Sequence, residues 1–251
     1  MIIEDASLDL PCLSTIAHRL ISRDGTHQDA AAPYLQEHSI EVYLNGCKTM
    51  ALTCVPQFLT ELILGRLLTE NIIQGTEDVQ WLRIPRDGKR ADITLRNSNG
   101  LPEDRILPHA FAEAASLKPV KPIFWKPEWI FQLADRFADG MPLHAATWAT
   151  HSCFLARNGK ILFSCEDIGR HNAMDKVIGY ALRKSIALSD CIVYSSGRIP
   201  VDMTVKAIRA GIPVLVSKAA PTQEAISLAN AYGLTLICSA RRDSMRQYTG
   251  W

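Results

Sequence analysis

The alternation of hydrophobic and polar residues between residues 38 and 54 predicts a β-hairpin. Its sequence, HSIEVYLNGCKTMALTC, has two strand-like runs that meet at Asn45-Gly46, a pair preferred in two-residue hairpin turns. Residues 57–73 then carry apolar side chains at helical spacing. Residues 78–84 and 91–97 have the pattern of two further strands, so we expect a small α+β unit here.

The pattern changes character twice more along the chain. Between residues 97 and 127 there are five prolines and no sustained periodicity, which is typical of a linker or a long surface loop. Pro127 then suits the first turn of a short helix. We expect an N-terminal extension, a small α+β domain, a proline-rich linker and a larger α/β domain over residues 1–36, 37–97, 98–127 and 128–251.

Residues 149–167 predict a second hairpin, with Asn158-Gly159 at its tip. A two-residue turn makes positions whose numbers sum to 317 face each other. His151 is then opposite Glu166, and Cys153 is opposite Ser164, on one face. Cys165 points to the other face because side chains alternate along a strand, so no disulfide with Cys153 is expected.

After this hairpin, short β-branched runs alternate with helices that end at Gly211 and Gly233. Asn172 is expected to cap the first of these helices. Strands that alternate with helices in this way predict an α/β domain with a parallel βαβαβ sheet.

Composition excludes several classes of protein. The net charge of +1 gives no overall field for nucleic acid or an acidic membrane, and no apolar run is long enough to span a bilayer. The N-terminus lacks the basic and apolar parts of a signal peptide, so we expect a cytoplasmic protein. Seven scattered cysteines without a C-x-x-C pair suit small buried side chains in a reducing compartment.

The expected strands end in loops that carry cations, at SSGR (195–198), SKAAP (217–221) and SARRD (239–243). The loop after residue 165 adds Arg170 and His171. Ligands of open parallel sheets bind at these strand ends, and helix N-termini there favour anions. The loops therefore predict a pocket for a phosphate-bearing ligand such as a nucleotide, although one loop cation by itself is usually only solvated. Neither GxGxxG nor GxxxxGK[ST] is present.

Several residues allow two interpretations. His151 and Glu166 are either an acid–base pair or a polar pair at the sheet rim. Cys153 is either a nucleophile or a buried filler. His144 is expected at a loop or core edge, and the indoles of residues 125, 129 and 148 in packing. His151-Ser152-Cys153 begins like a zinc deaminase, but the glutamate and the P-C-x-x-C of that motif are missing, so zinc is not expected.

The blocks EDIGRHNAMDKVIG and SSGRIPVDMTVKAIRAGIPVLVSKAA closely resemble the formate dehydrogenase accessory (FdhD) family. IEVYLNG and LILGRLLTENII resemble the N-terminal unit of that family. The resemblance covers roughly residues 37–97 and 140–249. It implies a cytidine-deaminase-like three-layer α/β domain with a mixed sheet, a smaller N-terminal α+β domain, and a homodimer.

The resemblance also implies a function. The family takes sulfur from a cysteine desulfurase as a persulfide and passes it to the bis-molybdopterin guanine dinucleotide form of the molybdenum cofactor, which then enters formate dehydrogenase. We expect this cofactor, or a GDP-like nucleotide, to be the ligand. The predicted binding residues are Asp167, Arg170, His171, Ser196, Gly197, Arg198, Lys218, Ser239, Ala240, Arg241, Arg242, Asp243 and Ser244.

Two departures from the family pattern concern sulfur transfer. The persulfide cysteines of the family lie in a C-G-x-C-G loop, whereas residues 98–127 contain no cysteine. The T-G-G-x-H-A segment matches Thr147–Ser152 with both glycines replaced. If transfer occurs, we expect Cys153 to carry the sulfur, with His151 and Glu166 tuning its ionisation. The alternatives are a cofactor-binding chaperone without chemistry and, third, a deaminase-like hydrolase.

Overall fold

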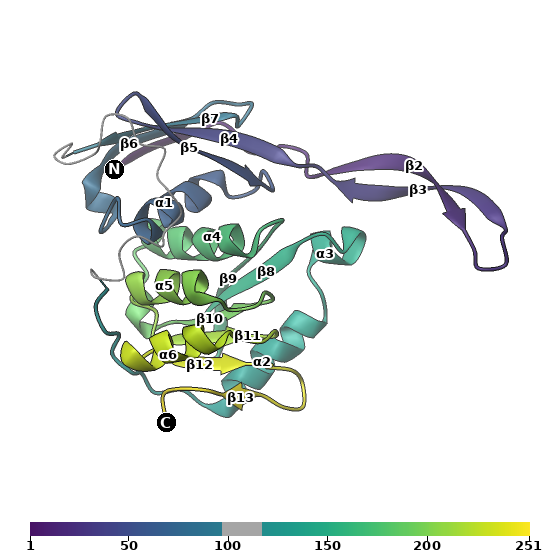
Figure 1. The fold of residues 1–251 in the computed structure, drawn as a ribbon. Coiled ribbons are helices and arrows are strands. Elements are labelled where there is room, and N and C mark those ends of the chain that lie inside the picture. Colours follow the sequence, from purple (N-terminus) through teal and green to yellow (C-terminus); the bar gives the residue numbers. More distant parts are fainter. Residues whose placement is uncertain (97–116) are drawn as a thin grey trace.

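Two β-sheets with helices between them and a projecting two-stranded arm form the computed structural model, which describes residues 1–96 and 117–251 (Figure 1). The N-terminal sheet has the strand order β1-β6-β7-β4-β5. Its strands, and the helix beneath it, are β1 (Ile2–Asp5), β4 (His38–Leu44), β5 (Cys47–Cys54), β6 (Val79–Ile84), β7 (Arg90–Leu95) and α1 (Leu59–Thr69). A 3₁₀ turn, Thr76–Asp78, precedes β6.

The C-terminal sheet has the order β13-β12-β11-β10-β8-β9. Its strands are β8 (His151–Arg157), β9 (Lys160–Asp167), β10 (Ile192–Ser195), β11 (Val214–Ser217), β12 (Thr235–Cys238) and β13 (Arg246–Gln247). β10, β11 and β12 are parallel, whereas β8 and β13 run antiparallel to their neighbours. The expected α/β class, with a mixed sheet and a smaller α+β unit, is confirmed; its cytidine-deaminase-like description stays a prediction.

Alternating side chains of the C-terminal sheet enter two hydrophobic cores. On one face, Phe154, Tyr194 and Val216 pack against α2 (Pro127–Ala138). On the other face, Leu155 and Val193 join the core shared with the N-terminal unit. The helices on that face are α4 (Arg170–Arg183), α5 (Val201–Arg209) and α6 (Gln223–Ala231), with a 3₁₀ turn at Leu188–Asp190. The sheet therefore lies between two layers of helices, as Figure 1 shows.

Both predicted hairpins are confirmed, but the register of the second is not as expected. A β-bulge between Leu155 and Ala156 shifts the pairing by one residue away from the tip. His151 consequently faces Asp167, and Glu166 faces Ser152. The expected pairing of His151 with Glu166 is therefore wrong.

The same shift changes the positions of two cysteines. Cys153 faces Cys165 directly, instead of Ser164, and both side chains lie in the core below α4. The expectation that Cys165 points away from Cys153 is wrong, although both thiols are free, in line with the absence of a disulfide.

Helices α1 and α4 join the N-terminal unit to the C-terminal sheet. A Cβ atom on Gly65 would come within 1.8 Å of the Asp175 carbonyl oxygen, and one on Gly179 within 1.8 Å of the Glu61 carbonyl oxygen. The two helices therefore cross in close backbone contact, which only glycine permits.

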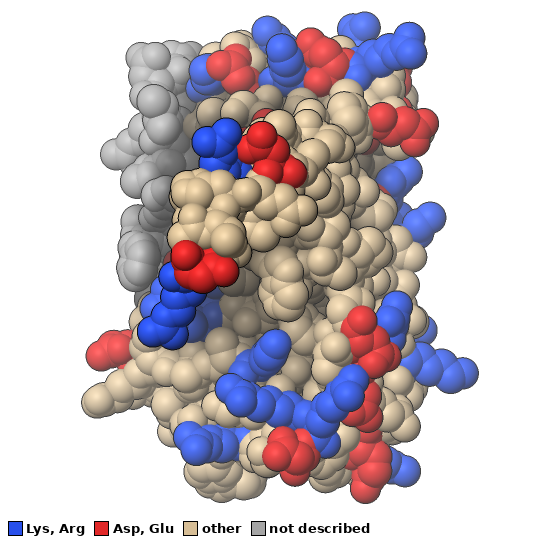
Figure 2. Space-filling view, turned by 90° about the vertical axis from the view of Figure 1, so that its right-hand side faces the viewer, with Lys and Arg blue, Asp and Glu red and all other residues tan. Residues whose placement is uncertain are grey.

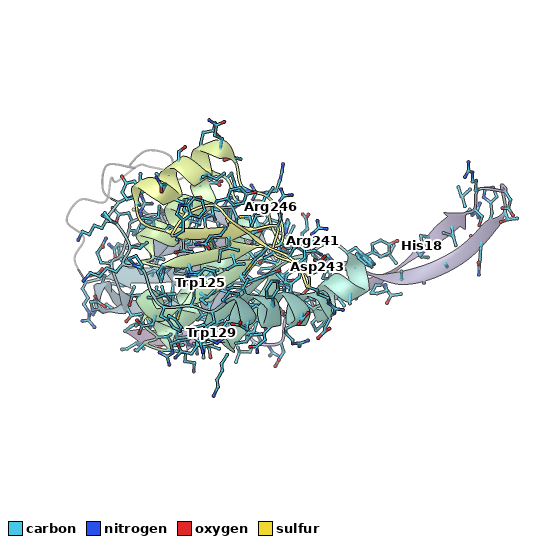
Figure 3. The ribbon with its side chains drawn as sticks, turned by 90° about the horizontal axis from the view of Figure 1, so that it is seen from below. His18, Trp125, Trp129, Arg241, Asp243 and Arg246 are labelled. Carbon is cyan, nitrogen blue, oxygen red and sulfur yellow. The ribbon has the colours of Figure 1, made fainter. Side chains whose placement is uncertain are left out.

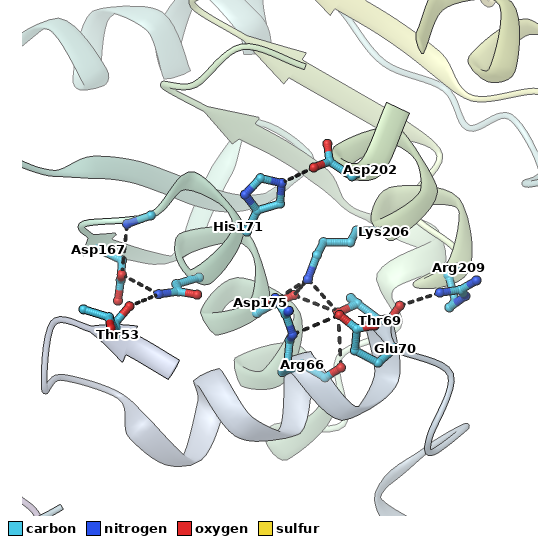
Figure 4. Close-up of polar contacts among 12 residues, drawn as sticks. Thr53, Arg66, Thr69, Glu70, Asp167, His171, Asp175, Asp202, Lys206 and Arg209 are labelled. Atoms are coloured by element: carbon cyan, nitrogen blue, oxygen red, sulfur yellow. Dashed lines mark hydrogen bonds and ion pairs between the residues drawn. The ribbon is translucent and has the colours of Figure 1, made fainter. Parts of the chain in front are cut away.

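A largely buried polar cluster lies beside this crossing, and we call it the interdomain cluster: Arg66, Thr69, Asp175 and Lys206 (Figure 4). Lys206 Nζ lies 2.6 Å and 2.7 Å from the two carboxylate oxygens of Asp175, and it donates to the Thr69 hydroxyl at 2.9 Å. Arg66 approaches the same carboxylate at 3.4 Å. The cluster links α1, α4 and α5, and the Glu70 carboxylate, 3.0 Å from Arg66, balances its second positive charge.

The N-terminal extension, for which no helix or strand was predicted, contains regular structure. β1 pairs with β6 in the N-terminal sheet. β2 (Leu13–Ile21) and β3 (His27–Leu35) form the arm, a nine-residue antiparallel ribbon that projects from the body in Figure 1. Of the predicted linker, residues 98–116 lie outside the described residues.

No helix within the described residues is both long and apolar enough to cross a membrane.

Candidate functional site: a pocket at the strand ends

The carboxyl ends of β10, β11 and β12 border a pocket of about 490 Å³. It lies at the predicted edge of the sheet, where open α/β sheets bind their ligands. Four of the site residues predicted from the sequence line it: the binding residues Ser196, Lys218 and Arg241, and His151, which was predicted beside Cys153. Its other lining residues are Phe137, His144, Trp148, Ala149, Thr150, Ser152, Ile168 and Ala219.

Positive charge gathers on the same side of the molecule. Figure 2 views this side, and Lys and Arg side chains cluster over the lower part of it. Seen from below, Arg241 and Asp243 lie at the end of the C-terminal sheet that is nearer the arm, and Trp125 and Trp129 lie farther from it (Figure 3). The exposed Lys218 and Arg241 thus meet solvent at the pocket mouth.

Hydrogen bonds fix the loops that form the pocket rim. The buried Ser217 hydroxyl donates to the Gly197 carbonyl at 2.6 Å and accepts from the Ala219 amide at 3.0 Å. The Ser239 amide donates to the Ala219 carbonyl, and the Ala240 amide donates to the Ser217 carbonyl at the end of β11, each at 2.9 Å. Gly197 and Ser239 do not line this pocket or the second hollow described below, so they support the loops of the rim without facing a ligand.

Phe137 from α2 separates the pocket from a second hollow of about 350 Å³. The Lys218 ammonium lies 5.4 Å from the centre of the Phe137 ring, so a cation–π contact holds it at the boundary. The second hollow includes Ala240, Arg241, Arg242 and Asp243 from the predicted set. Arg242 is 2.9 Å from Asp139, so part of its charge is already balanced.

His151 contributes a neutral imidazole to the pocket. Burial first, and then the charge of Arg170, lower the pKa of His151 below its ordinary 6.5. Its Nδ1 lies 2.9 Å from the Ser196 hydroxyl, which also accepts from the Ser152 amide at 3.1 Å. Arg170 Nε is buried with no hydrogen-bond partner in the part of the chain that the structure describes. The charge of Arg170 therefore lies close to His151 at the pocket.

Glu166 does not act on His151 directly; it holds the short helix α3 (Pro142–Thr147). Its carboxylate accepts from the amides of Leu143 and His144, at 2.8 Å and 2.6 Å, and from the Thr150 hydroxyl at 2.9 Å. Glu166 is only 4% exposed, and these three donors satisfy its buried carboxylate. The position of Glu166 is therefore that of a support for the pocket wall.

Asp167 is fully buried and lies away from the pocket lining. Its carboxylate is 2.6 Å from Lys176 Nζ and accepts from the amide of Val55 at 3.1 Å and from the side chain of Asn172 at 2.9 Å. Asn172 also donates to the Thr53 carbonyl at 2.7 Å, so it joins the two units. The expectation that Asn172 caps α4 is wrong, because Gly169 precedes the first turn.

Three further members of the predicted set lie outside both hollows. His171 Nε2 is 2.6 Å from the Asp202 carboxylate on α5. Arg198 is exposed, and Ser244 is exposed in the loop before β13. The two hollows therefore contain about half of the predicted site residues, and the others lie outside both hollows.

The expected pocket-side position of Cys153 is wrong, because Cys153 is 0% exposed in the core. Burial raises its pKa well above the ordinary value, and it raises the pKa of Cys165 to about 12. Of the seven cysteines, five are buried; Cys12 is half-buried and Cys47 is exposed.

Sequence patterns missed a wall of the pocket that α3 and the following turn supply. His144 donates from Nδ1 to the Thr150 carbonyl at 2.9 Å, and its ring lines the pocket. Trp148 was expected to pack in the interior, but it is 81% exposed. Trp125 and Trp129 do pack against the α2 core, as expected. The left-handed backbone of Trp148 places it here, and nothing in its residue type signals that conformation.

Among the residues that the structure describes, no three His, Cys, Asp or Glu side chains are grouped so that they could hold a metal ion.

The fold and the pocket define a class: an α/β protein with a cation-lined pocket at the carboxyl ends of its parallel strands. The sequence profile of the FdhD/NarQ family matches residues 35–251, so the chain belongs to this family. The family resemblance carried by the signature blocks is thereby confirmed.

Curated relatives and a solved structure agree with this membership. The sulfur carrier protein FdhD of Listeria monocytogenes is 26% identical over 95% of this chain and 98% of its own length. That of Geobacillus kaustophilus is 30% identical, over 90% of this chain and 92% of its own. A crystal structure of a candidate formate dehydrogenase accessory protein from Desulfotalea psychrophila superimposes with a TM-score of 0.81 and 25% identity, covering 95% and 97% of the two chains.

Proposed function

We propose that this protein is a formate dehydrogenase accessory protein whose pocket binds the guanosine diphosphate portion of bis-molybdopterin guanine dinucleotide. The observation that carries the proposal is the joint placement of Lys218, Arg241 and Ser196 around one pocket at the parallel strand ends. Two cations and a hydroxyl there suit the phosphate oxygens of a nucleotide. The molybdenum cofactor is the cargo in this proposal, and formate dehydrogenase is the enzyme that receives it.

The size and charge of the pocket support this ligand. A volume of about 490 Å³ lies within the range of roughly 300–1,000 Å³ that small-molecule sites occupy. The second hollow shares Phe137, Lys218 and Arg241 with it, which extends the surface open to a longer ligand. Arg170, whose Nε has no hydrogen-bond partner among the described residues, adds a half-buried positive group close to His151.

Isothermal titration calorimetry with GDP tests the binding proposal. We expect one site per chain, and an affinity that falls as salt rises because the phosphates are held by charge. Guanosine, which has the base without the phosphates, should bind much more weakly. Absence of GDP binding at low salt would remove the proposal.

Sulfur transfer from a cysteine desulfurase needs a thiol that a protein donor can reach. The thiolate would attack the outer sulfur of the donor persulfide, so the S–S bond of the donor breaks, an S–S bond forms on this protein, and the donor cysteine leaves as a thiolate. The step needs no external oxidant. Cys12 and Cys47 meet the requirement of access, whereas the buried Cys153 does not.

Persulfide mapping by mass spectrometry after incubation with a desulfurase and cysteine tests this step. We expect label on Cys12 or Cys47, and its loss in the corresponding Ser variant. Cys191→Ser, which alters a buried cysteine, is the matched control. Label on Cys153 would contradict the access argument.

The second candidate function is a cofactor-binding chaperone that transfers no sulfur. The burial of five of the seven cysteines, including both in the signature hairpin, favours it. GDP binding without label on any cysteine would establish this function.

The arm supports the homodimer expected from the family. Ile16, His18 and Leu20 share one face of the ribbon, and the first and third are about half exposed. On β3 the same face carries Tyr34, Ala32 and Ala30. An isolated two-stranded ribbon with an apolar face is marginal in water. We therefore infer that a second copy of this chain covers it.

The dimensions of the arm fit a dimer. A nine-residue ribbon about 30 Å long and about 10 Å wide presents on the order of 300 Å² on each face. Two arms, each covering an equal area of the other copy, would bury on the order of 1,200 Å², the lower limit for a stable specific interface.

Light scattering should accordingly give the mass of a dimer. Ile16→Ser/Leu20→Ser should shift it toward a monomer, and Thr15→Ser/Ala17→Ser, on the opposite face, should not. A wild-type monomer at tens of micromolar would contradict the dimer.

We propose the cytoplasm as the location of this protein. All seven cysteines are free, which suits a reducing compartment.

A further inference from the structure

The backbone of Trp148 adopts a conformation that tryptophan rarely takes. Its φ and ψ angles are 56° and 16°, in the left-handed region, at the end of α3. Bulky residues are strained there, and strain of this kind concentrates at binding and catalytic sites. Glycine or asparagine would adopt the same backbone more readily. The tryptophan is therefore held in an unfavourable conformation at this point of the chain.

The indole belongs to neither hydrophobic core. Trp148 is 81% exposed, although it lines the same pocket as Lys218 and Arg241. An exposed indole loses the contribution that its large apolar surface would make to a core. The indole is thus available to a ligand at the pocket.

The wall that carries Trp148 is rigid. Glu166 holds the first turn of α3, and the Trp148 amide donates to the His144 carbonyl at 2.8 Å. The imidazole of His144 is fixed by its bond to the Thr150 carbonyl, and it meets the indole edge-on, with ring centres 5.3 Å apart. The indole therefore has a fixed aromatic neighbour inside the pocket.

We propose that Trp148 is a stacking platform for the purine ring of the nucleotide whose phosphates Lys218 and Arg241 hold. The inference rests on the proposed nucleotide site, and it adds the group that recognises the base. A flat aromatic surface binds the face of a base through stacking, and cations at the other end of the pocket hold the phosphates. The platform distinguishes nucleotides from simple phosphate anions.

Calorimetry with two ligands, GDP and inorganic pyrophosphate, separates the base from the phosphates. Trp148→Gly and Trp148→Asn should weaken GDP binding by on the order of tenfold or more, the value of one lost stacking contact. The same variants should bind pyrophosphate as the wild type does. Trp148→Phe, which keeps an aromatic face, should lose much less affinity for GDP.

Folding is controlled within the same series. Trp148→Gly relieves the strained backbone, so its thermal midpoint should equal or exceed that of the wild type. Tryptophan fluorescence offers a second readout, since GDP should quench the wild type more than Trp148→Phe.

The outcomes distinguish this inference from the proposed function. Unchanged GDP affinity in Trp148→Gly, or wild-type affinity for GDP no greater than for pyrophosphate, would overturn the platform and leave the phosphate pocket standing. Equal losses for GDP and pyrophosphate would assign Trp148 to the shape of the pocket and would also overturn it. No binding of either ligand by the wild type would overturn both.

Discussion

The interdomain cluster and the pocket both contain several charged side chains, but these differ in burial and in the number of their partners. In the cluster, Lys206 and Asp175 are almost fully buried, and each has several partners at hydrogen-bond distance. In the pocket, Lys218 and Arg241 are exposed, and Phe137 is the contact that the structure gives for the first of them. A buried charge that lost its partner would destabilise the fold, whereas an exposed one is free to bind an anion.

One short stretch of sequence supplies both regions. Residues 166–176 contain Glu166, which supports the pocket wall, and Asp167, Asp175 and Lys176, which join the two units. Density of charged residues along the chain therefore says little about function. The number of partners that each charge already has in the folded protein separates structural from binding roles.

The largest expected effect on stability is that of Lys206→Met. It leaves the Asp175 carboxylate buried with only Arg66 and Thr69 as partners. We expect a loss of about 3 kcal/mol in the free energy of unfolding, measured by urea denaturation, and unchanged GDP affinity under native conditions. Lys184→Met, at an exposed lysine, is the control. A loss under about 1 kcal/mol would contradict the burial of the Asp175 carboxylate away from water.

A smaller effect is expected for Glu166→Gln. The amide of glutamine keeps only one accepting oxygen for the three donors that Glu166 now satisfies. We expect a loss of about 1–3 kcal/mol in unfolding experiments, with weaker GDP binding because α3 is less firmly held. Glu128→Gln on α2 should change neither quantity. A stable variant with lower GDP affinity would instead give Glu166 a direct role at the ligand.

The smallest effect concerns pH and His151. Because the pKa of His151 is lowered in the folded state, the unfolded chain takes up this proton first as the pH falls. Stability contributed by the neutral ring is present above about pH 6.5 and is lost as the pH falls toward the folded-state pKa. Denaturation of the wild type and of His151→Gln between about pH 7 and pH 5 should show a shallower decline for the variant. Parallel curves would mean that His151 has an ordinary pKa.

The sequence was a good guide to elements and a poor guide to contacts. Both hairpins followed from Asn-Gly turns, and the parallel strands from β-branched runs between helices, since these signals are local. The bulge at Leu155 depends on packing across the sheet, so the facing of His151 and Cys153 could not be read from turn length. The arm was missed because both of its faces are largely exposed, so apolar and polar residues do not alternate strictly along β2 and β3.

The binding site divides in the same way. Lys218 and Arg241 were predictable because strand ends of a parallel sheet meet at one edge. The buried roles of Glu166 and Asp167 were not, because their partners lie on α3 and at the end of β5, far away in the sequence. Trp148 was misjudged since exposure depends on a backbone angle that its residue type does not favour.

The central claim is that the free cations at the strand ends form a nucleotide pocket whose charges the fold does not need. The most direct test is the GDP affinity of Lys218→Ala/Arg241→Ala, measured together with its free energy of unfolding. We expect a loss of at least about a hundredfold in affinity, from two charge-assisted contacts of about 1.5–3 kcal/mol each, and stability within about 0.5 kcal/mol of the wild type. Wild-type affinity in this stably folded variant would contradict the account.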